Sequence, residues 1–156
     1  MCSDKRIGSQ FLFPGLGYGG SCFPKDVKAL IKTANENGCN ADLISSADKV
    51  NKRQRLLFVE KITKYFGEDL SNKTFAVWGL AFKPKTDDMR EAPSITIIKA
   101  LLEKGAKIQA YDPKAMQTAK YHFADKITYA NSSYEALENT DALLLLTEWN
   151  EFRRPD

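Results

Sequence analysis

The sequence has little of what disulfide-linked or membrane-spanning proteins need. It contains three cysteines, Cys2, Cys22 and Cys39, and none of them forms a CxxC pair. An odd number of unpaired thiols argues against a disulfide scaffold or a zinc site and favours a reducing compartment. No apolar run is long enough to span a bilayer, and the first residues lead into no apolar stretch typical of a signal peptide. We therefore expect a cytoplasmic protein with no membrane partner.

Strong charge of one sign is also lacking. The formal net charge is +3, and lysines and arginines are scattered among acidic residues, which indicates a solvated surface rather than a nucleic-acid platform. The single histidine, His122, lies in an amphipathic stretch far from the cysteines. A surface role fits it better than that of a catalytic base, which argues against a Cys-His enzyme.

Two helical patterns follow a glycine-rich N-terminal region. The first runs from Val27 and ends at Gly38, and the second runs from Leu43 to Phe66 and is closed by Gly67. The middle of the second pattern, residues 51–55, is polar on most sides, which is typical of a helix that bridges domains or subunits.

Short apolar runs then alternate with helical patterns, which predicts a parallel sheet with right-handed crossovers. The fold class is therefore α/β: a helical linker followed by a partial Rossmann-like parallel sheet with helices on both faces, whose ligands bind at the carboxyl ends of the strands. The expected units are a cysteine loop (1–26), a helical linker or dimerisation region (27–70) and the partial Rossmann-like domain (71–156). The expected strands are 74–80, 107–111, 127–129 and 142–146, and the expected helices between them are 92–105, 114–123 and 133–138.

The candidate chemistry lies in residues 15–26, GLGYGGSCFPKD. The glycines allow close approach of the backbone to a ligand. Cys22 stands just before a helix, where the helix dipole and Lys25 favour the thiolate. Asp26 lies about one turn further on, so that its carboxylate can face the same side as the sulfur. A nucleophile with a carboxylate in reach suits covalent catalysis followed by hydrolysis, although a small buried cysteine beside glycines remains the alternative.

Three segments in order resemble the UDP-glucose/GDP-mannose dehydrogenase family. FLFPGLGYGGSCFPKD (11–26) is similar to the family's active-site segment, and GLAFKPKTDDMREAPS (79–94) to the opening of its C-terminal domain. Thr147-Glu148-Trp149 resembles the turn after one of its strands. The resemblance implies oxidation of a sugar C6 alcohol to a carboxylate with two NAD⁺, through a thiohemiacetal and a thioester on Cys22, with Asp26 assisting proton transfer or positioning water.

The resemblance also assigns binding roles residue by residue. Lys83 would meet a phosphate, Arg90 would reach the NAD and Lys25 would give electrostatic support near bound groups. Arg6 would enter the neighbouring subunit's active site, which implies a homodimer around the long helix. The implied substrate-binding residues are Phe11, Leu12, Leu16, Gly17, Phe23, Phe82, Lys83 and Arg6.

The departures from the family pattern are equally specific. No strand with a GxGxxG turn precedes the cysteine loop, so we expect the main NAD site in a domain that this chain lacks, and the chain alone to be inactive. The strand at Thr74 also lacks GxGxxG, so its unit should bind UDP. For Asp112 we predict a turn or helix-capping role rather than ribose binding. A UDP-glucose enzyme is favoured; a GDP-mannose 6-dehydrogenase fragment and a non-catalytic nucleotide-sugar-binding or dimerisation module remain alternatives. In this family the uronate product commonly enters surface polysaccharides.

Overall fold

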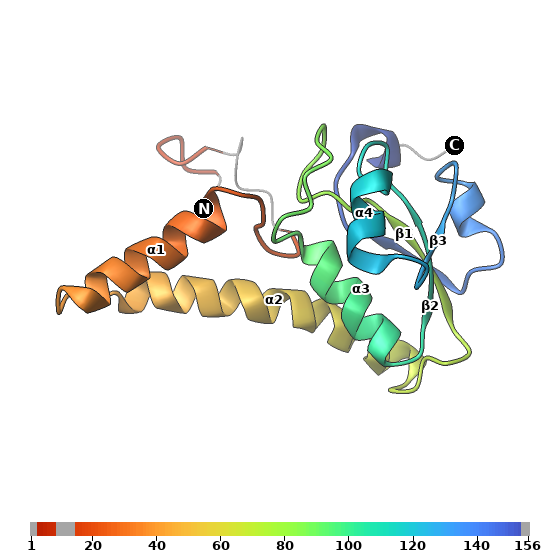
Figure 1. Cartoon of the computed structure of the whole chain (residues 1–156), viewed down its shortest axis with the longest axis horizontal. Coiled ribbons are helices and arrows are strands. Elements are labelled where there is room, and N and C mark those ends of the chain that lie inside the picture. The colour runs from red at the N-terminus through yellow and green to blue at the C-terminus, as the bar shows by residue number, and fades with distance from the viewer. Residues whose placement is uncertain (1–2, 9–14, 154–156) are drawn as a thin grey trace.

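The N-terminal half of the chain is a helical hairpin. The computed structural model describes residues 3–8 and 15–153. Helix α1 (Phe23–Glu36) runs out from the cysteine loop, and helix α2 (Asp42–Phe66) returns beneath it, as Figure 1 shows. Gly38 and Gly67 follow the two helices with φ of 67° and 96°, a conformation that glycine adopts without steric cost. Both helix ends therefore lie where the glycines predict them.

The C-terminal half is a parallel α/β unit. Its strands are β1 (Thr74–Trp78), β2 (Lys107–Tyr111), β3 (Thr128–Tyr129) and β4 (Ala142–Leu145). In the described part of the chain these form one sheet in the order β3-β2-β1-β4, with every neighbouring pair parallel. Helices α3 (Pro93–Glu103) and α4 (Met116–Phe123) make the crossovers. The α/β class predicted from the alternating pattern is confirmed.

The last helical segments are shorter than the sequence suggests. Residues 133–138, predicted to be a helix, contain only the 3-10 turn η1 (Glu135–Leu137). The Thr140 hydroxyl donates to the Leu137 carbonyl at 2.8 Å, so a side chain takes an acceptor that a longer helix would use. A second 3-10 turn, η2 (Asn150–Arg153), follows β4 and was not predicted.

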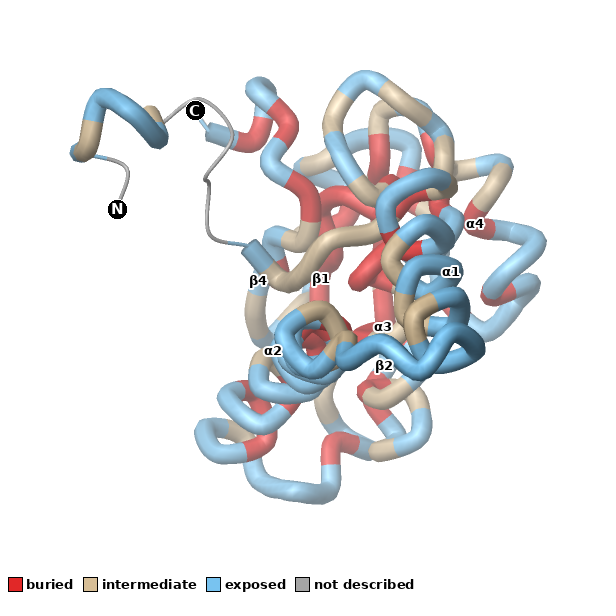
Figure 2. Tube along the Cα trace, turned by 90° about the vertical axis from the view of Figure 1, so that its left-hand side faces the viewer, coloured by how far each residue is buried: buried red, intermediate tan, exposed pale blue. Residues whose placement is uncertain are grey.

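The sheet is covered on both faces by different elements. Phe75 and Val77 of β1 face a core built with α2, α3 and α4, whereas Trp78 faces a smaller cluster with η1, Trp149 and Phe152. Figure 2 shows the buried residues concentrated in this α/β unit, while α1 and most of α2 are exposed. The hairpin therefore extends from a packed body, and α2 contributes Phe58, Val59, Ile62 and Phe66 of its C-terminal half to the core of that body. Within the described residues, no helix is long and apolar enough to cross a membrane.

Candidate active site

Cys22 lies at the start of α1 and is exposed. It is the residue before the first helical turn, and the Asp26 amide donates to its carbonyl at 2.9 Å. The Ser21 hydroxyl lies 3.7 Å from its sulfur, and Asp26 is itself exposed, 3.4 Å from the Lys25 ammonium. An accessible thiol at a helix N-terminus, with a carboxylate one turn along, is a suitable arrangement for a nucleophile and a proton acceptor.

The glycines before Cys22 are sites of very close approach between two loops. A Cβ on Gly19 would lie 2.4 Å from the Glu91 carbonyl oxygen, and one on Gly20 would lie 2.8 Å from the Phe82 ring. The Gly20 amide also donates to the Arg90 carbonyl at 2.8 Å. The cysteine loop is therefore docked directly on the loop that follows β1, which carries the predicted substrate-binding residues Phe82 and Lys83.

Two buried polar residues of α2 hold the other side of the cysteine loop. Asn51 accepts the Tyr18 amide at 2.8 Å and donates to the Tyr18 carbonyl at 3.2 Å. Arg55, 7% exposed, donates to the Tyr18 carbonyl at 2.8 Å and to the Glu91 carbonyl at 3.0 Å. Burial lowers the pKa of Arg55. Its Nε has no hydrogen-bond partner among residues 3–8 and 15–153.

Sequence reasoning missed these two residues. The sequence pattern indicated only a polar stretch in a helix that bridges domains or subunits, and Lys52, Arg53 and Gln54 are exposed. Asn51 and Arg55, however, are four residues apart, so they share one helix face. That spacing within a polar run is the signal that could have identified an inward-facing pair.

Asp112 organises the carboxyl ends of the strands. Its Oδ2 accepts the Leu80 and Ala81 amides at 2.7 and 3.1 Å and the Trp149 indole N–H at 3.3 Å. Its Oδ1 accepts the amides of Lys114 and Ala115, both at 2.8 Å, just before α4. The predicted turn role is confirmed, whereas α4 itself begins at Met116 without a side-chain cap. The same bonds occupy two amides of the turn after β1, which a Rossmann unit would otherwise offer to a dinucleotide phosphate.

A cavity of about 810 Å³ lies between the cysteine loop, α2 and the end of β4. It brings together the predicted substrate residues Leu16, Gly17 and Phe82. Two polar residues that the sequence did not single out, Gln54 and Arg153, also line it. Its size is within the range of small-molecule sites.

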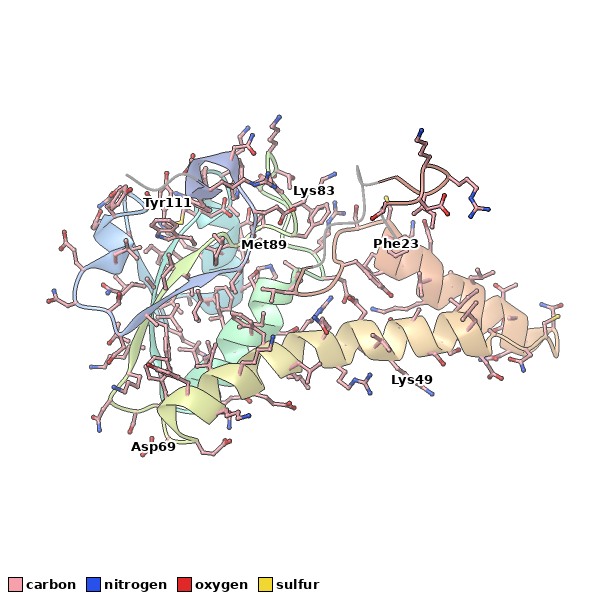
Figure 3. The ribbon with its side chains drawn as sticks, turned by 180° about the vertical axis from the view of Figure 1, so that it is seen from behind. Phe23, Lys49, Asp69, Lys83, Met89 and Tyr111 are labelled. Atoms are coloured by element: carbon pink, nitrogen blue, oxygen red, sulfur yellow. The ribbon has the colours of Figure 1, made fainter. Side chains whose placement is uncertain are left out.

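Other predicted residues lie around this cavity without lining it. The Lys83 ammonium is 5.2 Å from the centre of the Phe82 ring. Phe23 is 59% exposed and makes an edge contact with Tyr18 at 4.7 Å between ring centres. In Figure 3, Phe23 and Lys83 both lie on the upper side of α2. Phe11 and Leu12 lie outside the described residues.

The two predicted arginine contacts differ in their surroundings. Arg90 holds Asp88 at 2.8 Å, and this hydrogen bond raises the pKa of Arg90; the nearby Cys22 contributes less in the same direction. The same bond lowers the pKa of Asp88. Arg90 is therefore an exposed residue whose charge is paired with that of Asp88. Arg6 pairs with Asp4 at 2.6 Å and is exposed, and this chain alone does not bring it to the site.

Family models match most of the chain. Residues 1–53 match the central domain of the UDP-glucose/GDP-mannose dehydrogenase family, and residues 76–156 match the UDP binding domain of that family. The chain therefore belongs to the UDP-glucose/GDP-mannose dehydrogenase family.

Individual relatives agree on the family. A UDP-glucose 6-dehydrogenase of Pseudomonas aeruginosa is 45% identical over 161 residues, covering 100% of this chain and 36% of the relative. One of Bacillus subtilis is 46% identical over 154 residues, covering 99% and 35%. The chain thus spans about a third of the length of these relatives.

Solved structures show the same relation. A UDP-glucose dehydrogenase from Pyrobaculum islandicum superposes with a TM-score of 0.92 at 34% identity, covering 99% of this chain and 35% of that one. A GDP-mannose dehydrogenase from Pseudomonas aeruginosa gives 0.72 at 26% identity, covering 92% and 34%.

Proposed function

We propose that this chain is the cysteine loop, linking helix and UDP-binding part of an NAD-dependent UDP-glucose 6-dehydrogenase. The observation that carries the proposal is the docking of the Cys22 loop on the loop of Phe82 and Lys83, beside the cavity. A nucleotide held at the strand ends can then present its sugar to the thiol. The identities of 45% and 46% with enzymes named for UDP-glucose support this substrate.

Cys22 would act as the nucleophile on the sugar. Once C6 is at the aldehyde level, the sulfur adds to the carbonyl carbon and the carbonyl oxygen takes a proton, giving a thiohemiacetal. Loss of a hydride from C6, together with the hydroxyl proton, leaves a thioester. Water then attacks the thioester carbon, the C–S bond breaks, and the carboxylate and the free thiol are released. Asp26 would take the proton from that water, since its exposed carboxylate lies one helical turn from the thiol.

NAD⁺, when bound, would accept the two hydrides. The turn after β1 does not fit a dinucleotide, because Asp112 already holds the Leu80 and Ala81 amides. Lys25 and Arg90, 72% and 69% exposed, fit only a peripheral contact to an anionic cofactor. We propose that the main NAD site belongs to another domain and that this chain alone is inactive.

We also propose a homodimer through the long helix. Leu30 of α1 and Leu43 and Val50 of α2 are 52%, 86% and 50% exposed, and large apolar side chains exposed on an extended hairpin favour a protein partner. Cytoplasmic location and the absence of nucleic-acid or membrane partners remain predictions of the sequence.

The alternatives give different binding results. Isothermal titration calorimetry of this chain with UDP-glucose and with GDP-mannose should show binding of UDP-glucose only. Bound UDP-glucose should also slow the alkylation of Cys22 by iodoacetamide, measured by peptide mass spectrometry. The alkylation of Cys39, which is exposed, should not change. Preference for GDP-mannose would identify the other substrate class. Binding of UDP-glucose with no effect on Cys22 would favour a non-catalytic binding module, and binding of neither would refute the proposal.

A further inference from the structure

Arg55 joins two loops that carry different parts of the candidate site. Its guanidinium donates through the same nitrogen to the Tyr18 carbonyl in the cysteine loop and to the Glu91 carbonyl in the loop after β1. A second nitrogen reaches the Thr96 hydroxyl of α3 at 3.3 Å. One side chain of α2 thus contacts both loops and the neighbouring helix.

The backbone of both loops is unusual where Arg55 and Asn51 contact it. Glu91 has φ of 53°, an uncommon conformation for a residue with a side chain. Its carbonyl meets Arg55, and its carboxylate accepts Lys28 of α1 at 2.7 Å. On the other loop, a Cβ on Gly17 would lie 2.6 Å from the Asn51 amide oxygen. Asn51 and Arg55 therefore fix the cysteine loop at a spacing that only glycine permits.

Arg55 joins the two loops through hydrogen bonds rather than through a direct ion pair. Its guanidinium is buried, and its hydrogen-bonding acceptors in the described part of the chain are carbonyls and a hydroxyl rather than a carboxylate. A buried cation bound only by neutral acceptors recovers less of its desolvation cost than one in an ion pair. One guanidinium nitrogen holds the carbonyls of both loops while a second is directed at Thr96, an arrangement that the single nitrogen of a lysine cannot reproduce.

We propose that Arg55, assisted by Asn51, is a positioning residue that couples nucleotide binding to placement of the Cys22 thiol. The loop of Phe82 and Lys83 holds the nucleotide, the loop of Cys22 attacks the sugar, and Arg55 fixes the distance between them. This inference rests on the proposed function. It assigns Arg55 no contact with substrate.

The test separates nucleotide affinity from thiol placement. In Arg55→Met and Arg55→Lys, titration with UDP should give affinities within about threefold of wild type, because the nucleotide-binding loop keeps its bonds to Asp112. Protection of Cys22 from iodoacetamide by UDP-glucose should fall about tenfold or more, since loss of the bonds from Arg55 lets the cysteine loop open. Arg53→Met is the matched control, because Arg53 is exposed on the same helix.

Amide hydrogen exchange of the ligand-free chain supplies a reading that needs no ligand. Both Arg55 variants should exchange faster at Tyr18 and Gly20, while the amides of β1 and β2 keep their wild-type protection. Arg55→Lys serves if Arg55→Met does not fold. Wild-type protection of Cys22 and wild-type exchange in the Arg55 variants would overturn the inference while leaving the proposed function intact. Failure of the wild-type chain itself to bind UDP-glucose would refute the proposed function, and the coupling with it.

Discussion

The close approach between Gly19 of the cysteine loop and Glu91 of the loop after β1 gives a prediction that a second glycine variant can control. A Cβ added at Gly19 would lie 2.4 Å from the Glu91 carbonyl oxygen, whereas ordinary contacts begin at 3.4 Å. Gly19→Ala must therefore separate the two backbones by about 1 Å (3.4 − 2.4). The obstacle is a backbone atom rather than the flexible end of a side chain, so it cannot simply rotate away.

The separation should weaken several bonds at once. The Glu91 carbonyl accepts a hydrogen bond from the Arg55 guanidinium at 3.0 Å, and the Gly20 amide donates to the Arg90 carbonyl at 2.8 Å. A displacement of about 1 Å takes both beyond hydrogen-bonding distance. Overpacking of this kind costs about 1–3 kcal/mol of unfolding free energy, and we expect Gly19→Ala to fall in that range.

Gly15→Ala is the matched control for stability, because a Cβ there meets no described atom within 4 Å and Gly15 has no positive φ. It is not a control for binding, because Gly15 lines the cavity. In urea unfolding, Gly15→Ala should match wild type and Gly19→Ala should lose stability. Titration of Gly19→Ala with UDP-glucose should show about tenfold or more weaker binding than wild type. If Gly19→Ala were as stable as Gly15→Ala and bound UDP-glucose like wild type, the docking of the loops would be refuted.

Three further predictions concern charged side chains. Asp112→Ala removes the acceptor of five N–H groups named above and should lower the unfolding free energy by about 3 kcal/mol or more in urea unfolding; an unchanged midpoint would contradict the role of Asp112 at the strand ends. The hydrogen bond with Arg90 lowers the pKa of Asp88 from its ordinary value of 3.8, so its contribution to stability is present above that pH and is lost as pH falls through the folded-state pKa. Asp88→Asn should therefore show a smaller loss of unfolding free energy between pH 5 and about pH 3 than wild type does, and parallel curves would exclude this contribution. Lys83→Ala should weaken UDP binding about tenfold, as loss of one charge-assisted hydrogen bond to a phosphate would. Lys49→Ala, at an exposed position on α2 (Figure 3), is the control and should bind UDP like wild type. If the Lys83 and Lys49 variants bound UDP equally well, Lys83 would not belong to the nucleotide site.

The elements of the fold were largely predictable because they depend on local patterns. Strand β2 has the bounds that its apolar run predicts, and α2 ends at the glycine expected to close it. The prediction of a helix at residues 133–138 was wrong, because a short segment can use side-chain hydrogen bonds in place of helical ones. The Thr140 hydroxyl provides such a bond, and periodicity does not record it.

The candidate site was predictable only in part. The glycine loop, Cys22 and Asp26 stand together in the sequence, so their types and spacing identify them. Arg55 and Asn51 are more than thirty residues from Tyr18, the residue whose backbone they hold. Because polar residues in the middle of a long helix usually face solvent, only the observed packing distinguishes this pair from Arg53.

The sequence by itself determined the family, the alternation of strands and helices, and the residues able to carry thiol chemistry, since these follow from residue type and short-range spacing. Tertiary structure decided which loops meet. Gly19 against Glu91 and Gly20 against Phe82 are contacts across more than sixty residues, made possible by chain folding rather than by local propensity. Asp112 likewise binds segments that are distant in the sequence, because β1, β2 and the segment after β4 end at one edge of the sheet. Parallel strands bring their carboxyl ends together, and that juxtaposition turns separate motifs into one site.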